Sequence, residues 1–141
     1  MTRGEFSARK LKKSRKKMKW KDVHYMKRQL RLKRKEPLGD SPQGKGIVID
    51  KRVCEQKQPH SGLIKTVRVQ LVKNNIQVTA FVPGNKAIDQ INEHDEVVIE
   101  GMGGSQGGPI GSQWGLKYKV VMVNGIALSE ILSGKKQKPM R

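Results

Sequence analysis

Basic residues gather at the two ends of this chain, and their uneven distribution constrains its fold more than any other feature. Residues 1–36 contain 16 Lys or Arg against 3 Asp or Glu, residues 37–133 contain 10 against 9, and residues 134–141 contain 4 against none. A segment with such excess charge cannot bury enough apolar surface to fold alone, whereas the nearly neutral middle can. We therefore predict a basic extension (1–36), a linker (37–44), a globular domain (45–133) and a basic tail (134–141).

The overall charge predicts a polyanionic partner. With a formal net charge of +18 over 141 residues, the chain is expected to bind nucleic acid or an anionic membrane. No apolar run approaches the roughly 20 residues of a membrane-spanning helix. Nucleic acid is therefore the predicted partner, and a membrane is not. The single cysteine, Cys54, excludes an intrachain disulfide and suits a reducing compartment.

The extension is predicted to be helical over Ser7–Lys35. This stretch is dense in Lys, Arg, Leu and Met, which favour helices, and Val23, Met26 and Leu30 recur at helical spacing. Pro37 ends any such helix. Because like charges repel along it, we expect the extension to be largely disordered in the free protein and helical when docked on a polyanion.

The middle of the chain predicts a mainly β fold. Five apolar or alternating segments read as strands, and the second and third flank a two-asparagine turn, which is typical of a hairpin. A five-stranded OB-fold barrel is the economical choice, with an SH3-like barrel as the alternative. The predicted strands are Ile47–Val53, Thr66–Val72, Ile76–Val82, Glu96–Glu100 and Leu116–Asn124, followed by a short helix at Ala127–Leu132. Most of the core is expected from Val67, Val69, Leu71, Val78, Ala80, Val82, Val97, Ile99, Val120 and Val121.

The spacing of residues does not match the common motifs for nucleotide binding, zinc binding or catalysis. The glycine-rich segment Gly101–Gly115 lacks the third glycine of a dinucleotide fingerprint, since Gln106 stands there, and no P-loop lysine follows. We predict a flexible connecting loop, with close backbone approach to RNA as the alternative. The three histidines and Cys54 form no zinc spacing, and no catalytic constellation stands out. The sequence thus predicts no metal, no cofactor and no enzymatic activity.

The segment Gln56–Lys65 is the most informative loop. Pro59 stiffens it, Gly62 permits unusual dihedrals, and His60 and Ser61 can donate and accept hydrogen bonds. The loop between the first two strands of an OB fold often contacts nucleic acid, yet an ordinary polar turn explains the same residues equally well. Aromatic residues are few, which favours contacts to phosphate, sugar and shape over stacking of successive bases.

Ordered motifs along nearly the whole chain resemble one known family. They are ARKLKKSRKK (8–17), KGIVIDK (45–51), KQPHSG (57–62), VRVQL (67–71), VTAFVPG (78–84), EHDEVVIEG (93–101), KYKVVMVNG (117–125) and GKKQKP (134–139). The chain is similar to the universal small-subunit ribosomal protein twelve family, in its archaeal and eukaryotic branch.

This resemblance implies an OB barrel at the decoding centre, whose long basic extension threads into ribosomal RNA. One loop of the family contacts the RNA bases that inspect codon–anticodon pairing, and a second loop also faces the RNA. The first loop corresponds to Lys57, Gln58, Pro59, His60, Ser61 and Gly62, and the second to Ser112, Gln113, Trp114, Gly115 and Lys117. Phosphate contacts are expected from Arg9, Lys10, Lys12, Lys13, Arg15, Lys16, Lys17 and Lys19.

The sequence departs from the family pattern at both loops. His60 replaces an asparagine, Gly62 an alanine and Ile64 a basic residue, while Ser112 and Trp114 replace an aspartate and a proline. A histidine can still donate a hydrogen bond, so RNA contact is expected to survive at the first loop. Because Ser112 stands in place of the aspartate, chemistry that needs this aspartate is not expected at the second loop.

We therefore expect a structural protein of the cytoplasmic ribosome that binds small-subunit rRNA and helps to monitor codon–anticodon pairing. Its expected partners are that rRNA and neighbouring ribosomal proteins, with transient proximity to tRNA, mRNA and elongation factors. The alternative is a free-standing OB-fold RNA chaperone or translation factor.

Overall fold

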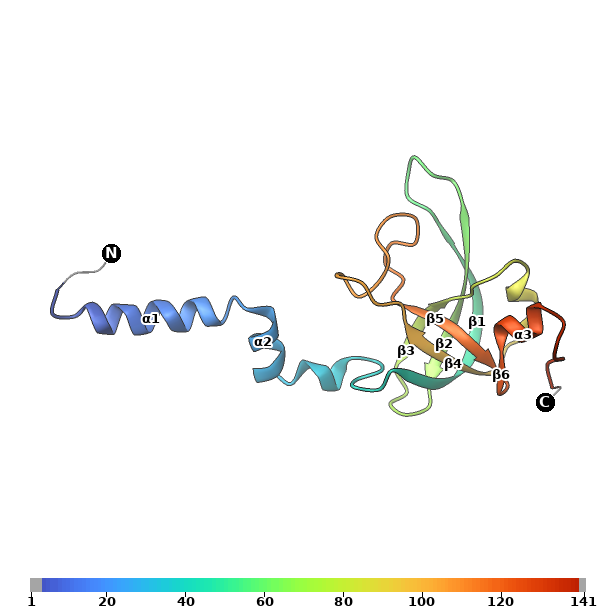
Figure 1. Cartoon of the computed structure of the whole chain (residues 1–141), viewed down its shortest axis with the longest axis horizontal. Helices are drawn as coiled ribbons and strands as arrows, with labels where there is room; N and C mark the ends of the chain where they lie inside the picture. The colour runs from blue at the N-terminus through green and yellow to red at the C-terminus, as the bar shows by residue number, and fades with distance from the viewer. Residues whose placement is uncertain (1–3, 140–141) are drawn as a thin grey trace. The chain divides into compact units, whose positions relative to one another are not determined.

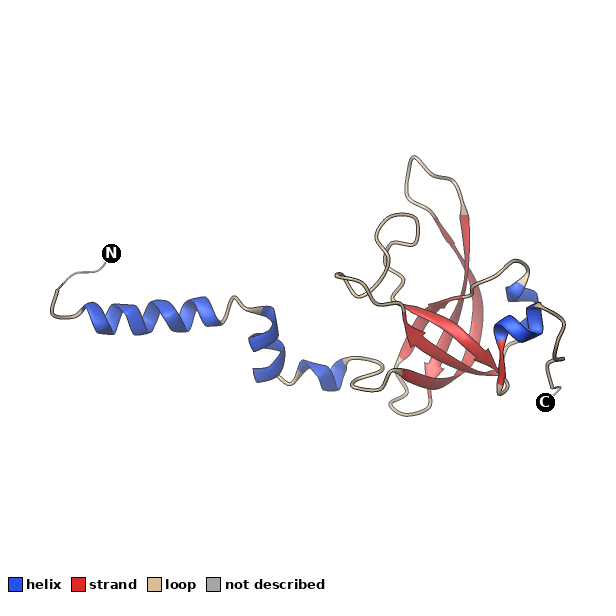
Figure 2. Ribbon diagram, in the orientation of Figure 1, coloured by secondary structure: helices blue, strands red, loops and turns tan. Residues whose placement is uncertain are grey.

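The computed structural model describes residues 4–139, and the chain divides after Asp40 into two compact units. The chain is mainly β, with one largely antiparallel sheet in the second unit and three α-helices among the described residues. Figure 1 traces the elements along the chain, and Figure 2 separates helices from strands. No helix within residues 4–139 combines the length and the apolar character needed to cross a membrane.

The first unit contains helix α1 (Ser7–Lys19), helix α2 (Val23–Gln29) and a 3-10 helix, η1 (Leu32–Lys35). The extension is helical as predicted, but the prediction of one continuous helix over Ser7–Lys35 is wrong. Asp22 interrupts it, because its Oδ1 accepts a hydrogen bond from the backbone N–H of His24 (2.9 Å) and so caps a new helix. Arg31 then adopts a left-handed conformation (φ 52°), which ends α2. Disorder of the extension in the free protein stays a prediction.

The second unit is built on a sheet with the strand order β3-β2-β1-β4-β5-β6. All neighbouring pairs in that order are antiparallel, and a short parallel pairing of β3 with β5 links strands from the two sides of the sheet. Each of the five predicted strands is present, and β6 is an addition. The bounds are β1 Gln43–Glu55, β2 Leu63–Leu71, β3 Gln77–Phe81, β4 Glu96–Gly101, β5 Tyr118–Val123 and β6 Ile126–Ala127. The predicted short helix is α3 (Leu128–Leu132), and a second 3-10 helix, η2 (Ala87–Gln90), precedes β4.

Strand β1 is long because it pairs along its first part with β4 and along most of its length with β2. Gly46 lies where both pairings overlap, opposite Leu71 on one side and Val97 on the other. A Cβ atom there would stand 2.3 Å from Val69 Cγ1 and 2.8 Å from the Gln70 carbonyl oxygen. Glycine is therefore required at this position by the close approach of two strands.

The core forms where the strands turn their apolar side chains toward one another. Nine of the ten predicted core residues are buried, and Val121 is half-buried. The exception has a local cause: Val120 pairs with Ile99 and Met122 with Val98, so Val121 is an extra residue in the ladder. Ile49 is the corresponding extra residue in β1, and it is exposed.

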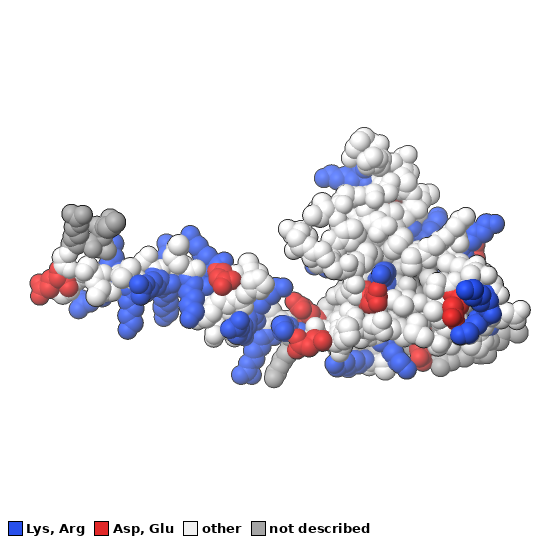
Figure 3. Space-filling view, viewed as in Figure 1, with Lys and Arg blue, Asp and Glu red and all other residues white. Residues whose placement is uncertain are grey.

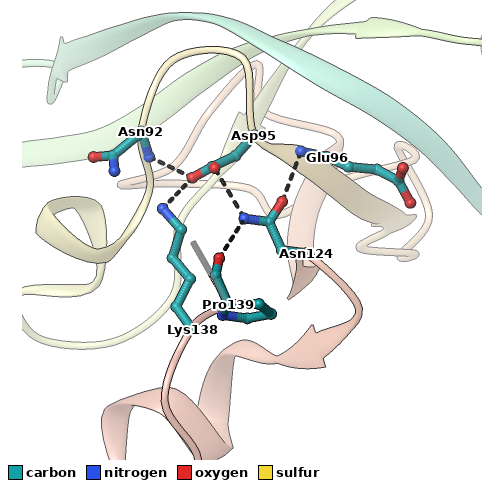
Figure 4. A network of polar contacts seen from close by, with 6 residues as sticks. All are labelled: Asn92, Asp95, Glu96, Asn124, Lys138 and Pro139. Carbon is teal, nitrogen blue, oxygen red and sulfur yellow. Dashed lines mark hydrogen bonds and ion pairs between the residues drawn. The ribbon is translucent and has the colours of Figure 1, made fainter. Parts of the chain in front are cut away.

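The C-terminal tail is tied to the sheet unit by the polar network in Figure 4. Lys138 forms an ion pair with the carboxylate of Asp95, which also accepts hydrogen bonds from the Asn92 backbone (2.7 Å) and Asn124 Nδ2 (3.0 Å). Asn124 also accepts a hydrogen bond from the Glu96 backbone (3.0 Å). The network joins the turn before β4 to the turn after β5 and to the tail.

Burial raises the pKa of Asp95, but the hydrogen bonds from Lys138, Asn92 and Asn124 outweigh it, so the net pKa lies below its ordinary value. The carboxylate therefore stays charged inside the network at neutral pH.

Candidate nucleic-acid interface

Helix α1 carries the densest positive charge in the described chain. Eight of its 13 residues are Lys or Arg, none is acidic, and none is buried. At 3.6 residues per turn these cations surround the helix except along one narrow stripe that contains Leu11 and Met18. Among residues 4–139 no ion pair involves a residue of α1. Figure 3 shows the Lys and Arg side chains gathered along the extension.

The later part of the extension is partly neutralised within itself. Lys27 pairs with Glu36 (3.2 Å) and Lys33 pairs with Asp40 (2.8 Å). The hydrogen bond from Lys33 to Asp40 raises the pKa of this lysine. The cations without an acidic partner thus lie mainly before Trp20, where the predicted phosphate contacts are.

The first predicted loop joins β1 to β2 and is fully exposed from Lys57 to Gly62. Two hydrogen bonds between Gln56 and Gly62 close the base of the loop. The backbone N–H of Gln56 donates to the Gly62 carbonyl (3.0 Å), and its side-chain Oε1 accepts from the Gly62 N–H (3.1 Å). The His60 N–H donates to the Lys57 carbonyl (3.1 Å), and the peptide bond before Pro59 is cis. The hydrogen bonds close the loop at its base, and His60 and Ser61 are exposed.

Ile64 lies just beyond this loop but belongs to the core. It is buried on β2 opposite Cys54. The apolar residue at a position where the resemblance expects a basic one therefore reflects packing, and it takes no part in the exposed loop.

The second predicted loop lies between β4 and β5. It folds back on itself: the Met102 N–H donates to the Lys117 carbonyl (2.9 Å), and the Trp114 N–H donates to the Gly111 carbonyl (3.1 Å). Gly108 packs on the backbone of Leu116, which is buried. The loop is thus held by its own hydrogen bonds and by close backbone packing, and the flexibility that its composition predicts stays a prediction.

The two loops extend from the same end of the sheet unit (Figure 1). Lys57 Nζ lies 5.4 Å from the centroid of the Trp114 ring, within the range of a cation–π contact. This contact brings the two predicted groups of site residues together. Sequence reasoning named both loops but missed the contact, since nothing in the spacing of Lys57 and Trp114 indicates it.

Five ion pairs lie within the described residues of the sheet unit. Glu100 on β4 accepts from Lys119 on β5 (2.8 Å) and from Gln43 on β1 (3.1 Å), and these bonds lower its pKa. Within the described residues no group of three or more His, Cys, Asp or Glu side chains is placed to hold a metal ion. Lys57 and Lys117 are both exposed, each belongs to one of the two loops, and neither takes part in an ion pair among residues 4–139.

A basic helical extension and a mainly β unit whose two predicted loops are in contact make up the described part of the chain. Residues 31–141 match the family of ribosomal protein S12/S23. The chain belongs to this family, and it is thus a protein of the small ribosomal subunit, a component of the ribonucleoprotein that carries out translation. The match includes the whole sheet unit with both loops, and helix α1 precedes it.

Proposed function

We propose that this protein binds small-subunit rRNA through its extension and loops and helps to monitor codon–anticodon pairing at the decoding centre. The sheet unit would act as a rigid five-stranded OB barrel, and the extension of residues 1–36 as an rRNA anchor. The same proposal places it in the cytoplasmic ribosome, near tRNA, mRNA and elongation factors during translation. Its role is structural and regulatory rather than catalytic.

One observation carries the proposal for the loops. The two segments that the family resemblance assigns to the decoding RNA, 57–62 and 112–117, meet through Lys57 and Trp114. Two loops that are fastened at their bases and share one contact form a stiff surface. Such a surface loses little conformational entropy when RNA closes on it.

The extension supports the other half of the proposal. A helix with eight cations, no acidic residue and no buried face gains nothing from packing within its own unit. Phosphate oxygens would supply the missing counter-charges. The proposed contacts at Arg9, Lys10, Lys12, Lys13, Arg15, Lys16, Lys17 and Lys19 all lie on this helix.

A misreading assay beside a gradient profile tests the loop. Lys57→Ala and Ser61→Ala should change codon misreading or elongation rate severalfold while subunits still assemble, because a shift of about 1.4 kcal/mol changes a conformational equilibrium tenfold. Lys73→Ala, at an exposed lysine in the β2–β3 turn, is the matched control. Normal decoding by the loop variants combined with lost assembly would instead make this loop a structural anchor.

A further inference from the structure

Two large apolar side chains are unusually open to solvent. Ile110 is 73% exposed and Trp114 is 72% exposed, the highest values among the large apolar residues described. Both line the same shallow pocket of about 350 Å³, together with Pro109 and Lys117. Exposed apolar surface of this kind at the edge of a pocket indicates a ligand or a partner surface.

The pocket is held open by the backbone of its own loop. Leu116 anchors it as a buried residue, and its N–H donates to the Gln113 carbonyl (3.2 Å). At Gly108 a Cβ atom would stand 2.4 Å from the Leu116 carbonyl oxygen, so the wall there is bare backbone. The buried Leu116 and the close backbone approach at Gly108 therefore form a fixed wall of the pocket that Trp114 also lines.

The positive charge beside the pocket indicates which kind of ligand it binds. Lys57 Nζ lies 5.4 Å from the Trp114 ring centroid, and Lys117 lines the pocket. The ring remains largely exposed although Lys57 lies over it. An aromatic face next to two cations suits a nucleobase with its flanking phosphates, since the base stacks and the phosphates neutralise the lysines.

We propose that Trp114 is a stacking site for one unpaired nucleobase of RNA, with Ile110 contacting the base and Lys57 and Lys117 its phosphates. This inference rests on the proposed RNA binding and extends it by naming the ligand group and the residue that receives it. Because Lys57 belongs to the first loop and Trp114 to the second, one bound nucleotide engages both loops at once.

Fluorescence of Trp114 tests the proposal in the full chain. Trp20→Phe leaves Trp114 as the only tryptophan, since the chain has two. This protein is titrated with an RNA hairpin that carries a single bulged adenine, and with the same hairpin carrying an abasic nucleotide at the bulge. We expect saturable quenching with the adenine hairpin and little with the abasic one.

Affinity measurements on variants complete the test. Trp114→Ala should weaken binding of the adenine hairpin about tenfold, whereas Trp114→Phe retains most of it. Val72→Ala, at an exposed apolar residue outside the pocket, is the control and should change nothing. Equal binding of the two hairpins without quenching would overturn the stacking site and favour an apolar protein side chain as occupant. Failure of every RNA to bind would instead contradict the proposed function itself.

Discussion

The two basic ends of this chain look alike in sequence but are used differently in the structure. Helix α1 carries eight cations, and none of them pairs with an acidic side chain among residues 4–139. In the C-terminal tail, Lys136 pairs with Glu130 and Lys138 with Asp95. A lysine that already pairs with an acidic side chain of the protein binds phosphate more weakly than an unpaired one. We therefore expect the lysines of α1 to contribute more to RNA binding than Lys136 and Lys138 of the tail.

The largest expected effect separates the two ends directly. Lys16→Gln with Lys17→Gln should reduce the slope of log K for RNA against log salt by roughly 2, and affinity at 0.1 M salt by up to about 60-fold. The free energy of unfolding should stay within about 0.5 kcal/mol, because both side chains are exposed and unpaired. Salt titrations with an RNA duplex and chemical denaturation measure the two quantities.

The matched control applies the same change to the tail. Lys136→Gln with Lys138→Gln should lower stability and alter the salt slope by less than 1. Equal slopes for the two double variants would break the comparison, since the tail lysines would then be phosphate ligands like those of α1.

Much of the sheet unit could be predicted from the sequence, because alternation over Thr66–Val72 and Ile76–Val82 leaves one register that buries the apolar set. The hairpin and six of the nine buried core residues follow from that pattern. The extra residues Ile49 and Val121 could not be predicted, since a bulge depends on how the partner strand pairs. The interrupted helix could have been predicted in part, because an aspartate inside a run of helix formers is a common N-cap.

The candidate site was predictable only as separate pieces. The family resemblance predicts that both loops face RNA, and the excess of basic residues predicts that the extension binds it. The contact between Lys57 and Trp114 depends on β1, β2, β4 and β5 meeting in one sheet, and local sequence carries no signal for it. The pairing of Lys138 with Asp95, which is 43 residues away, could not be predicted from local sequence either. Charge alone makes the tail and the extension look alike.

Lys138→Met should have the largest effect on stability within the tail. The side chains of Lys138 and Asp95 are only 15% and 9% exposed. Removing the lysine leaves a nearly buried carboxylate with fewer partners, which costs about 1–3 kcal/mol. Chemical denaturation followed by circular dichroism measures the loss. A double-mutant cycle with Asp95→Asn isolates the pair, and an interaction energy near zero would show that the tail is not fastened.

The pH dependence of stability provides a further test of the same network. The folded-state pKa of Asp95 lies below its ordinary value of 3.8, so its contribution is complete above the unfolded pKa and declines as pH falls toward the folded pKa. The difference in unfolding free energy between wild type and Asp95→Asn should therefore be constant near neutrality and shrink below about pH 4. A gap that stays constant down to pH 3 would contradict this assignment.

The smallest expected effect concerns Lys136, which lies between the two extremes. Its Nζ is 2.8 Å from Glu130 Oε2, but the side chains are 59% and 38% exposed. Exposed pairs contribute about 0.2–1 kcal/mol, so Lys136→Gln should lower the free energy of unfolding by less than about 1 kcal/mol. Phosphate can compete for a lysine held this weakly. Glu130→Gln, which releases Lys136 without removing it, should raise RNA affinity by at most about fivefold. Unchanged affinity in this variant, measured beside Lys136→Gln, would place Lys136 out of reach of RNA and confine the RNA-binding charge to the extension and the two loops.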